Sequence, residues 1–277
     1  MSVFSSSVPI LVTRLRAAGC VFAEDEAQLL VSTAATPDEL AAMVERRVAG
    51  EPLEYVLGWA EFCGLRVAVA PGVFVPRPRT EFLIQEAVAL ARRVAGTPVV
   101  LDLCCGTGAM GAALAAELER AELHATDLDP AAVRCARRNL GAGHVYEGDL
   151  YEPLPASLRG RVDIVIASPP YVPSESVALL PAEARLHEPL VALDGGGDGL
   201  DVVRRVIAGA PQWLAPGGHL LVETSERQAA ATAETVARAG LAARVASSAE
   251  LDATAVIGTR PQRRGFSGAA APAAPPA

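Results

Sequence analysis

Two short turns in this sequence carry residues of the types that could hold a ligand beside a reacting nitrogen. Cys104-Cys105-Gly106-Thr107-Gly108 follows an apolar run that ends in Asp102-Leu103. Ser168-Pro169-Pro170-Tyr171 follows a later apolar run, residues 162–167. A glycine turn after one buried strand and a turn of this kind after a later one are typical of enzymes that methylate a planar nitrogen. The pair predicts a first turn that binds S-adenosylmethionine (SAM) and a second that binds the nitrogen to be methylated.

The glycine turn has the composition of a loop that approaches a ligand with its backbone. Only small residues permit such a sharp turn, and the amides of the helix that follows can receive the carboxylate of SAM. We therefore predict that the cofactor is bound by Asp102, Cys104, Cys105, Gly106, Thr107 and Gly108. A nucleotide site or an ordinary strand-to-helix turn would look similar from these residues alone.

Acidic residues follow the next two predicted strands. Asp127 lies about 20 residues beyond the glycine turn, where a carboxylate can accept the ribose hydroxyls of an adenosine ligand. A dehydrogenase would place an acid in the same way, and the other role for Asp127, helix capping, is better suited to Asp129. We predict that Asp149 bonds the adenine amino group while Leu150 packs on the ring. A solvated loop acid is the alternative for Asp149.

The Ser-Pro-Pro-Tyr turn suits a nitrogen whose lone pair is delocalised. Its prolines fix the backbone and have no N–H of their own to compete for the carbonyls. Hydrogen bonds from the nitrogen to the Ser168 side chain and the Pro169 carbonyl would rotate the lone pair toward the methyl group. Pro170 completes the predicted substrate-binding turn, and Tyr171 would stack on the planar group. A proline-rich loop that merely ends a strand is the alternative interpretation.

Strands and helices alternate from residue 79 to residue 262, which predicts one α/β domain. Expected strands are 99–103, 123–127, 162–167 and 219–223, and expected helices include 81–94 and 108–120. Alternation of this kind predicts a largely parallel, Rossmann-like doubly wound sheet with ligands at the carboxyl ends of its strands. That is the fold of a class I SAM-dependent methyltransferase.

The rest of the chain divides into three further segments. Residues 1–50 predict a small helical domain for substrate recognition, in which Thr36 and Glu39 form a capping box. Residues 51–78 carry glycines, prolines and short alternating runs, which predict a linking β-hairpin. Residues 263–277 are an Ala/Pro tail too poor in large apolar groups to fold, so we expect disorder there.

Composition excludes several classes of function. The chain has 277 residues and no lysine among its 24 basic residues, which excludes Schiff-base chemistry and a lysine-dependent phosphate loop. A net charge of −8 argues against a large footprint on nucleic acid. The five cysteines contain no C-x-x-C spacing, which indicates reduced thiols and no metal site. With no signal peptide or membrane span in sight, we expect a cytoplasmic monomer.

More specific blocks of sequence surround the two turns, between residues 20 and 260. They are Glu51-Pro52-Leu53-Glu54-Tyr55-Val56-Leu57-Gly58, Glu61-Phe62, Val75-Pro76-Arg77-Pro78-Arg79-Thr80-Glu81, Glu183-Ala184-Arg185, His187-Glu188-Pro189 and Ala192-Leu193-Asp194-Gly195-Gly196. With these blocks the sequence resembles the HemK/PrmC family of protein-(glutamine-N5) methyltransferases. The resemblance implies SAM as cofactor, Pro76 and Arg77 beside it, and a protein substrate, the polypeptide release factor, held partly by the helical domain.

Three departures from the family pattern bear on the substrate. Ser168 stands where the family has asparagine, and the one asparagine of this chain is Asn139. Arg79 stands where the family has an acid, and the helical domain is shorter than usual. Serine is chemically tolerable, because amino-methyltransferases of DNA cytosine use the same turn, but its reach is shorter. The departures suggest a diverged paralogue, with the release factor as one candidate substrate.

Two other functions remain open from the sequence. A nucleic-acid amino-methyltransferase acting on cytosine N4 or adenine N6 would use the same turns, although the acidic chain offers no obvious basic groove. A SAM-binding protein without catalysis is the other alternative.

Overall fold

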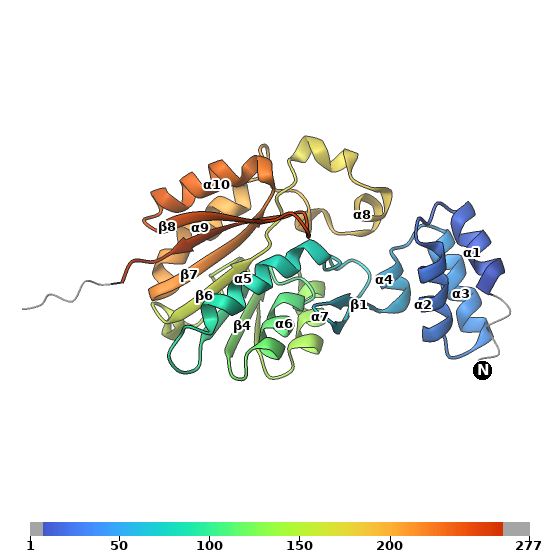
Figure 1. Ribbon diagram of the computed structural model, residues 1–277, viewed down its shortest axis with the longest axis horizontal. Coiled ribbons are helices and arrows are strands. Elements are labelled where there is room, and N and C mark those ends of the chain that lie inside the picture. Colours follow the sequence, from blue (N-terminus) through green and yellow to red (C-terminus); the bar gives the residue numbers. More distant parts are fainter. Residues whose placement is uncertain (1–7, 263–277) are drawn as a thin grey trace, which may run out of the picture.

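The main body of the protein is a seven-stranded sheet with helices on both faces, and a small helical lobe lies at one end of it (Figure 1). The computed structural model describes residues 8–262, so the expected tail 263–277 lies outside the described residues. The predicted α/β arrangement is confirmed.

The helical lobe consists of α1 (Val8–Ala17), α2 (Ala23–Thr33) and α3 (Pro37–Val48). The Thr36 hydroxyl accepts a hydrogen bond from the Glu39 amide, and the Glu39 carboxylate accepts one from the Ala35 amide. The predicted cap by Thr36 is confirmed, whereas the Glu39 carboxylate reaches the amide one position before Thr36 and not that of Thr36 itself. Leu15, Leu30 and Val44 are fully buried among the three helices.

A short helix and a hairpin connect the lobe to the body. Helix α4 (Leu53–Leu57) precedes the antiparallel strands β1 (Trp59–Phe62) and β2 (Leu65–Ala68). The hairpin packs on the body, because Phe62 and Val67 are buried in the same cluster as the first helices of that domain. The Asn139 side chain also hydrogen-bonds both the amide and the carbonyl of Ala68, each at 2.9 Å. The hairpin is therefore fixed to the body by a polar clamp as well as by apolar contacts.

The sheet has the order β5-β4-β3-β6-β7-β9-β8. Its strands are β3 (Val99–Leu103), β4 (Glu122–Asp127), β5 (His144–Glu147), β6 (Val162–Ala167), β7 (Leu214–Thr224), β8 (Ala242–Ser248) and β9 (Ala253–Thr259). Strands β3 to β7 are parallel, and β9 is antiparallel to both neighbours. From β3 the chain adds β4 and β5 on one side of the sheet, and from β6 it adds β7, β8 and β9 on the other side. The carboxyl ends of β3 and β6 therefore form the switch point at which such sheets bind ligands.

Helices cover both faces of the sheet. One face packs against α5 (Glu81–Ala91), α6 (Ala109–Glu117) and α7 (Pro130–Leu140), and the other against α9 (Asp201–Trp213) and α10 (Glu226–Arg238). In β3, Val100 is buried against the first group, whereas Leu101 and Leu103 are buried against the second. Burial on both faces explains why the central strands are continuous apolar runs.

Most expected elements of the body are found, with differences at their ends. Strands 99–103 and 162–167 have the predicted bounds, whereas the helix expected over 81–94 ends at Ala91 and that expected over 108–120 spans Ala109–Glu117. Strand β7 begins at Leu214, earlier than predicted. Helix α9 and strand β8 were missed. Helix α9 contains Pro211 and a glycine, and β8 is an exposed edge strand rich in alanine, so neither has the usual sequence signature.

The chain between β6 and α9 arches over the carboxyl ends of the strands. It contains the 3₁₀ turn η3 (Ser174–Leu179), helix α8 (Ala182–His187) and the 3₁₀ turn η4 (Leu190–Ala192), and we call residues 173–192 the cap segment. Figure 1 shows α8 between the body and the helical lobe. Two further 3₁₀ turns, η1 (Pro78–Thr80) and η2 (Ala156–Leu158), precede α5 and β6. No helix within residues 8–262 is both long and apolar enough to cross a membrane.

Candidate functional site

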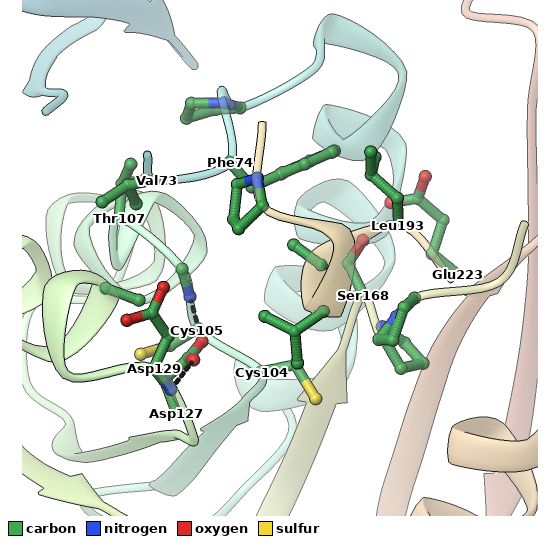
Figure 2. A pocket seen from close by; sticks show the side chains of 18 of the residues that line it. Val73, Phe74, Cys104, Cys105, Thr107, Asp127, Asp129, Ser168, Leu193 and Glu223 are labelled. Carbon is green, nitrogen blue, oxygen red and sulfur yellow. Dashed lines mark hydrogen bonds between the residues drawn. The ribbon is translucent and has the colours of Figure 1, made fainter. Parts of the chain in front are cut away.

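A cavity of about 460 Å³ opens at the switch point of the sheet. Nearly all of the predicted site residues line it: Pro76, Arg77, Cys104, Cys105, Gly106, Thr107, Asp127, Asp149, Leu150, Ser168, Pro169, Pro170 and Tyr171. Asp102 and Gly108 do not line it, because Asp102 is buried beneath the glycine loop and Gly108 begins helix α6. Figure 2 shows Asp127 and Asp129 on one side of this cavity and Ser168 and Glu223 on the other.

The two glycines of the loop have different functions. Gly106 has a φ of 55°, and a Cβ atom built there would meet no protein atom within 4 Å, so its backbone faces open space. Gly108 has a φ of 76°, and a Cβ atom there would lie 3.1 Å from the Cβ of Ala136 on α7. The first glycine therefore exposes backbone to the cavity, whereas the second lets two helices approach each other.

Asp127 ends β4 beside the glycine loop. Its Oδ2 accepts a hydrogen bond from the Gly106 amide at 2.8 Å, and its Oδ1 accepts one from the Asp129 amide at 2.9 Å. Burial raises the pKa of the Asp127 carboxyl, although these two amides oppose the shift. Each oxygen keeps a lone pair for a further donor, as a ribose would supply. Asp129 caps α7 by accepting from the Ala131 amide at 2.8 Å, as the sequence predicted.

Asp102 has an unpaired oxygen under the loop. Its Oδ2 accepts from the Gly111 amide at 3.0 Å, but no described residue bonds Oδ1. Burial raises the pKa of the Asp102 carboxyl to about 8. The buried hydroxyl of Thr126 has no partner within the described residues either. Thr126 lines the cavity, so its unpartnered hydroxyl fits a ligand that carries polar groups, as SAM does.

Asp149 forms an ion pair that the sequence did not predict. Its Oδ2 lies 2.6 Å from Nη2 of Arg205 on α9. No signal identified Arg205, because helix α9 itself was missed. The next residue, Leu150, is buried with a φ of 50°, a strained backbone conformation for leucine. The second Asp149 oxygen remains available for the predicted contact with an adenine amino group.

The Ser-Pro-Pro-Tyr turn keeps its predicted acceptors free. Neither the Ser168 hydroxyl nor the Pro169 carbonyl has a hydrogen-bond partner among residues 8–262. The turn rests on the loop 194–199, in which glycine is required by close packing. A Cβ atom at Gly195 would lie 2.8 Å from the Pro170 carbonyl oxygen, and one at Gly199 would clash with the Tyr171 carbonyl oxygen. The glycines of this block therefore support the turn from behind.

Beside the turn lies a polar cluster that sequence reasoning missed. The carboxylate of Glu223, at the end of β7, accepts hydrogen bonds from the Tyr171 hydroxyl at 3.0 Å and the Thr80 hydroxyl at 2.7 Å. Nε of Arg79 lies 3.3 Å from the same carboxylate. Glu223 was predicted only as the last residue of a strand. Glu223 lines the cavity, and its position at the carboxyl end of a predicted strand was the signal that could have identified it.

The Pro76-Arg77 turn contacts the cap segment. Nη2 of Arg77 lies 2.6 Å from both oxygens of Glu188, which also accepts from the Val75 amide at 3.2 Å. Burial raises the pKa of Glu188, while Arg77 opposes that shift. The guanidinium of Arg77 stacks over the Phe74 ring. These contacts join two of the sequence blocks, residues 75–81 and 187–189, into one wall of the cavity.

The chain is similar in sequence to known methyltransferases. Residues 65–199 match the family model described as the methyltransferase small domain. A release factor glutamine methyltransferase of Geobacter sulfurreducens is 41% identical over 74% of this chain and 72% of its own length. A 4-amino-L-phenylalanine/4-methylamino-L-phenylalanine methyltransferase of Streptomyces pristinaespiralis is 42% identical over 68% of this chain and 65% of its own length.

A solved structure supports the fold. A methyltransferase from Pyrococcus furiosus aligns with a TM-score of 0.52 at 19% identity, over 72% of this chain and 90% of that chain. The predicted Rossmann-like class I methyltransferase fold is thereby confirmed.

Proposed function

Because this chain belongs to the release factor glutamine methyltransferase family, we propose that it transfers a methyl group from SAM to the side-chain amide nitrogen (N5) of a glutamine in a protein. The observation that carries the proposal is the pair of unbonded acceptors on Ser168 and Pro169, set in one cavity with the glycine loop. The proposed protein substrate is a polypeptide release factor.

SAM is the cofactor, and it supplies an electrophilic methyl group on a sulfonium. The backbone of the glycine loop and the carboxylates of Asp127 and Asp149 would hold it, with Pro76 and Arg77 alongside. These acidic groups match the positive charge of the cofactor.

On the acceptor side, the chain orients the nitrogen and prepares its lone pair. The Ser168 hydroxyl and the Pro169 carbonyl would each accept one of the two N–H bonds of a glutamine amide. Those hydrogen bonds strengthen as positive charge develops on the nitrogen, so they favour the transition state over the ground state. The Tyr171 ring supplies a flat face for the amide plane. No strong base is required, since the methylated nitrogen loses its proton readily.

A second candidate is an aromatic amine of a free amino acid. The 4-amino-L-phenylalanine/4-methylamino-L-phenylalanine methyltransferase of Streptomyces pristinaespiralis is as similar to this chain as the release factor glutamine methyltransferase of Geobacter sulfurreducens. Ser168 favours this candidate, because the shorter side chain leaves more room at the acceptor turn than asparagine would. An aryl amine also offers two N–H bonds and a planar face.

The test is a comparison of acceptors with labelled SAM. We expect transfer to an unmethylated release factor, located by mass spectrometry on one glutamine, and none to DNA or RNA. Faster transfer to 4-amino-L-phenylalanine would replace the proposal with the second candidate, and transfer to nucleic acid would refute both. SAM binding without transfer to any acceptor would indicate a binding protein. The monomeric state and the cytoplasmic location stay predictions, which light scattering and cell fractionation would check.

A further inference from the structure

Glu223 is a buried carboxylate in the acceptor half of the cavity, and the reaction as described makes no use of it. Only 5% of the residue is exposed. Burying a charge is costly, so a carboxylate in such a position needs a compensating set of donors. Its donors are the hydroxyls of Thr80 and Tyr171 and the guanidinium of Arg79.

The register of the sheet brings Glu223 to the acceptor turn. Ala167 of β6 pairs with Val222 of β7, so Ser168 and Glu223 are the next residues along two neighbouring parallel strands. Successive side chains of a strand alternate between faces, and these two residues therefore point to the same side. In Figure 2 both side chains extend into the same part of the cavity.

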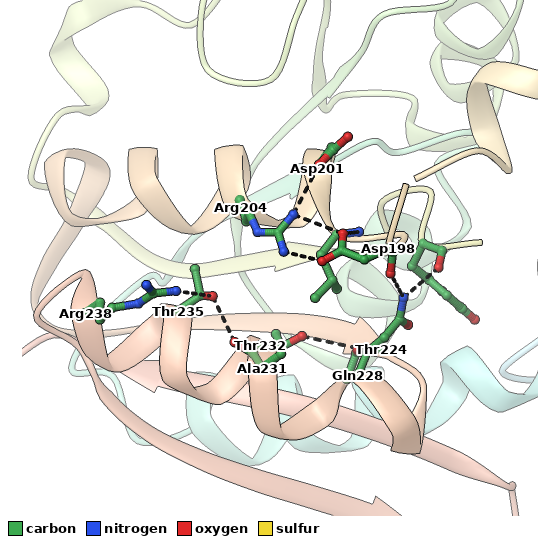
Figure 3. A network of polar contacts seen from close by, with 11 residues as sticks. Asp198, Asp201, Arg204, Thr224, Gln228, Ala231, Thr232, Thr235 and Arg238 are labelled. Carbon is green, nitrogen blue, oxygen red and sulfur yellow. Dashed lines mark hydrogen bonds and ion pairs between the residues drawn. The ribbon is translucent and has the colours of Figure 1, made fainter. Parts of the chain in front are cut away.

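Tyr171 is held at both of its ends. Its hydroxyl donates to Glu223 Oε1, and its carbonyl accepts from Gln228 Nε2 at 3.0 Å. Gln228 also donates to the Asp198 carbonyl at 3.0 Å, which joins the start of α10 to the loop below the turn (Figure 3). The guanidinium of Arg79 lies 5.9 Å from the centre of the Tyr171 ring. The ring thus has one fixed orientation, set by side chains from three distant parts of the sequence.

We propose that Glu223 is a positioning residue for the acceptor: it fixes the Tyr171 ring as the surface on which the planar nitrogen group stacks. The inference rests on the proposed function and adds to it a residue that acts only through tyrosine. Without this hydrogen bond the phenol could rotate away from the turn, and the acceptor would lose its alignment with the methyl group.

The protonation states agree with this role. Burial, and then the negative charge of Glu223, raise the pKa of the Tyr171 phenol, which therefore keeps its proton and acts as the donor. Both oxygens of Glu223 accept hydrogen bonds from protein donors. These donors are the side chains that shape the acceptor turn, which argues for positioning rather than for base catalysis.

A simple stabilising ion pair does not account for the arrangement. The Arg79 side chain is 48% exposed and its Nε lies 3.3 Å from the carboxylate, so the pair is of the kind that contributes little to stability. Arg79 stands where the family has an acid, a change that places a positive charge beside Glu223. Its guanidinium offsets the buried charge without replacing the bond to tyrosine.

The kinetic test is a double-mutant cycle on the full-length enzyme, with unmethylated release factor as acceptor. We expect Glu223→Ala and Tyr171→Phe each to lower kcat/KM for the acceptor by about 10- to 100-fold, with SAM affinity unchanged. Because the two residues act as a unit, the double variant should be no worse than about twofold below the poorer single variant. Glu223→Gln, which still offers an acceptor oxygen, should restore part of the activity. A double variant whose loss of kcat/KM equals the product of the two single losses would overturn the proposal.

A spectroscopic test needs no acceptor and so separates this inference from the proposed function. The chain has four tyrosines, and the signal of Tyr171 in ¹³C-tyrosine-labelled enzyme is the one lost in Tyr171→Phe. We expect Glu223→Ala to move that signal alone, and Glu223→Gln to move it less. Glu86→Gln, a control on α5 whose carboxylate pairs with Arg244 at the surface, should leave it unchanged. An unmoved Tyr171 signal in Glu223→Ala would overturn the proposal even if the release factor is methylated.

Discussion

The two halves of the cavity are built in opposite ways. Apart from the Pro76-Arg77 turn, the cofactor half comes from one stretch of chain, residues 102–150, and presents backbone amides and the ends of adjacent strands. The acceptor half combines residues 79–80, 168–171, 194–199 and 223 with the cap segment, and its surface is made of side chains and prolines. Local sequence can specify the first half, whereas only the completed fold assembles the second.

The halves also differ in how their acids are compensated. Asp102 and Asp127, under and beside the glycine loop, accept bonds from backbone amides and have no ion pair among the described residues, whereas Asp149 at the far end of the same half pairs with Arg205. Glu223, on the acceptor side, pairs with Arg79 and accepts bonds from two hydroxyls. A cationic cofactor would supply positive charge near Asp127, while the charge of Glu223 is already balanced, which suits a site for an uncharged amide.

The largest effect we expect is on the ion pairs of Arg47, which connect the helical lobe to the cap segment. Arg47, only 6% exposed, bonds Glu26 within the helical lobe at 2.6 Å and Glu183 of the cap segment at 2.6 Å. Arg47→Met leaves the Glu26 carboxylate buried without its partner, and removal of one member of such a pair costs about 3–5 kcal/mol. Hydrogen exchange of α2 and α3 should show that loss. Methylation of a protein acceptor should fall, with SAM affinity unchanged.

A matched control is available in the same lobe. Arg14→Met removes an arginine from an exposed pair with Glu45, and exposed pairs contribute about 0–1 kcal/mol. If Arg47→Met lowers the free energy of SAM binding by as much as it lowers the stability of the helical lobe, then the cofactor half does not bind SAM independently of the lobe.

Asp127 tests the cofactor half. Asp127→Ala removes the acceptor predicted for the ribose hydroxyls, and losing two charged hydrogen bonds should weaken SAM binding by roughly 2–4 kcal/mol. Calorimetry measures the affinity directly. Asp163→Asn is the control: Asp163 lies at the amino end of β6, away from the cavity, and accepts from the Val99 amide, so this variant should bind SAM like the wild type. Equal affinities of Asp127→Ala and wild type would refute the assignment.

Ser168 tests the acceptor half by an effect on turnover. Loss of one preorganised hydrogen bond should cost roughly 2–4 kcal/mol, so Ser168→Ala should turn over about 10² to 10³ times more slowly with SAM affinity nearly unchanged. Ser168→Asn restores the residue usual in the family. It should retain or raise activity on a release-factor glutamine, whereas a pocket shaped around serine for another acceptor should lose activity. Unchanged turnover in both variants would show that Ser168 only ends a strand.

These differences explain what the sequence could and could not predict. Buried parallel strands are apolar runs whose ends are marked by Gly106, Asp127 or Pro169, so β3, β4 and β6 and the residues that follow them were predicted. Helix caps at Thr36 and Asp129 depend on neighbours within one turn and were equally accessible.

The rest depends on contacts between distant segments. Glu223 meets Thr80 across 143 positions of sequence, and Arg47 meets Glu183 across 136. Neither pairing leaves a local pattern. Arg205 was missed with its helix, because Pro211 and a glycine obscure the helical signal of α9. Strand β8 shows no alternation of apolar residues, since it lies exposed at the sheet edge.

The smallest effect concerns pH, and it comes from a buried acid of the cofactor half. Burial raises the pKa of Asp102 to about 8, whereas an aspartate in the unfolded chain titrates near pH 4, at about 3.9. Between these values the native state holds a proton that the unfolded state has lost, so the free energy of unfolding falls as pH rises, by at most about 1.4 kcal/mol per pH unit. Denaturant unfolding at pH 6 and 7.5 without SAM should therefore show a loss of about 2 kcal/mol that Asp102→Asn abolishes. Saturating SAM should reduce the same loss, because a positive charge bound above the glycine loop lowers the pKa of the carboxyl beneath it. Ser168→Ala should keep the full pH dependence, and equal slopes in wild type and Asp102→Asn would show that the carboxyl is not the group responsible.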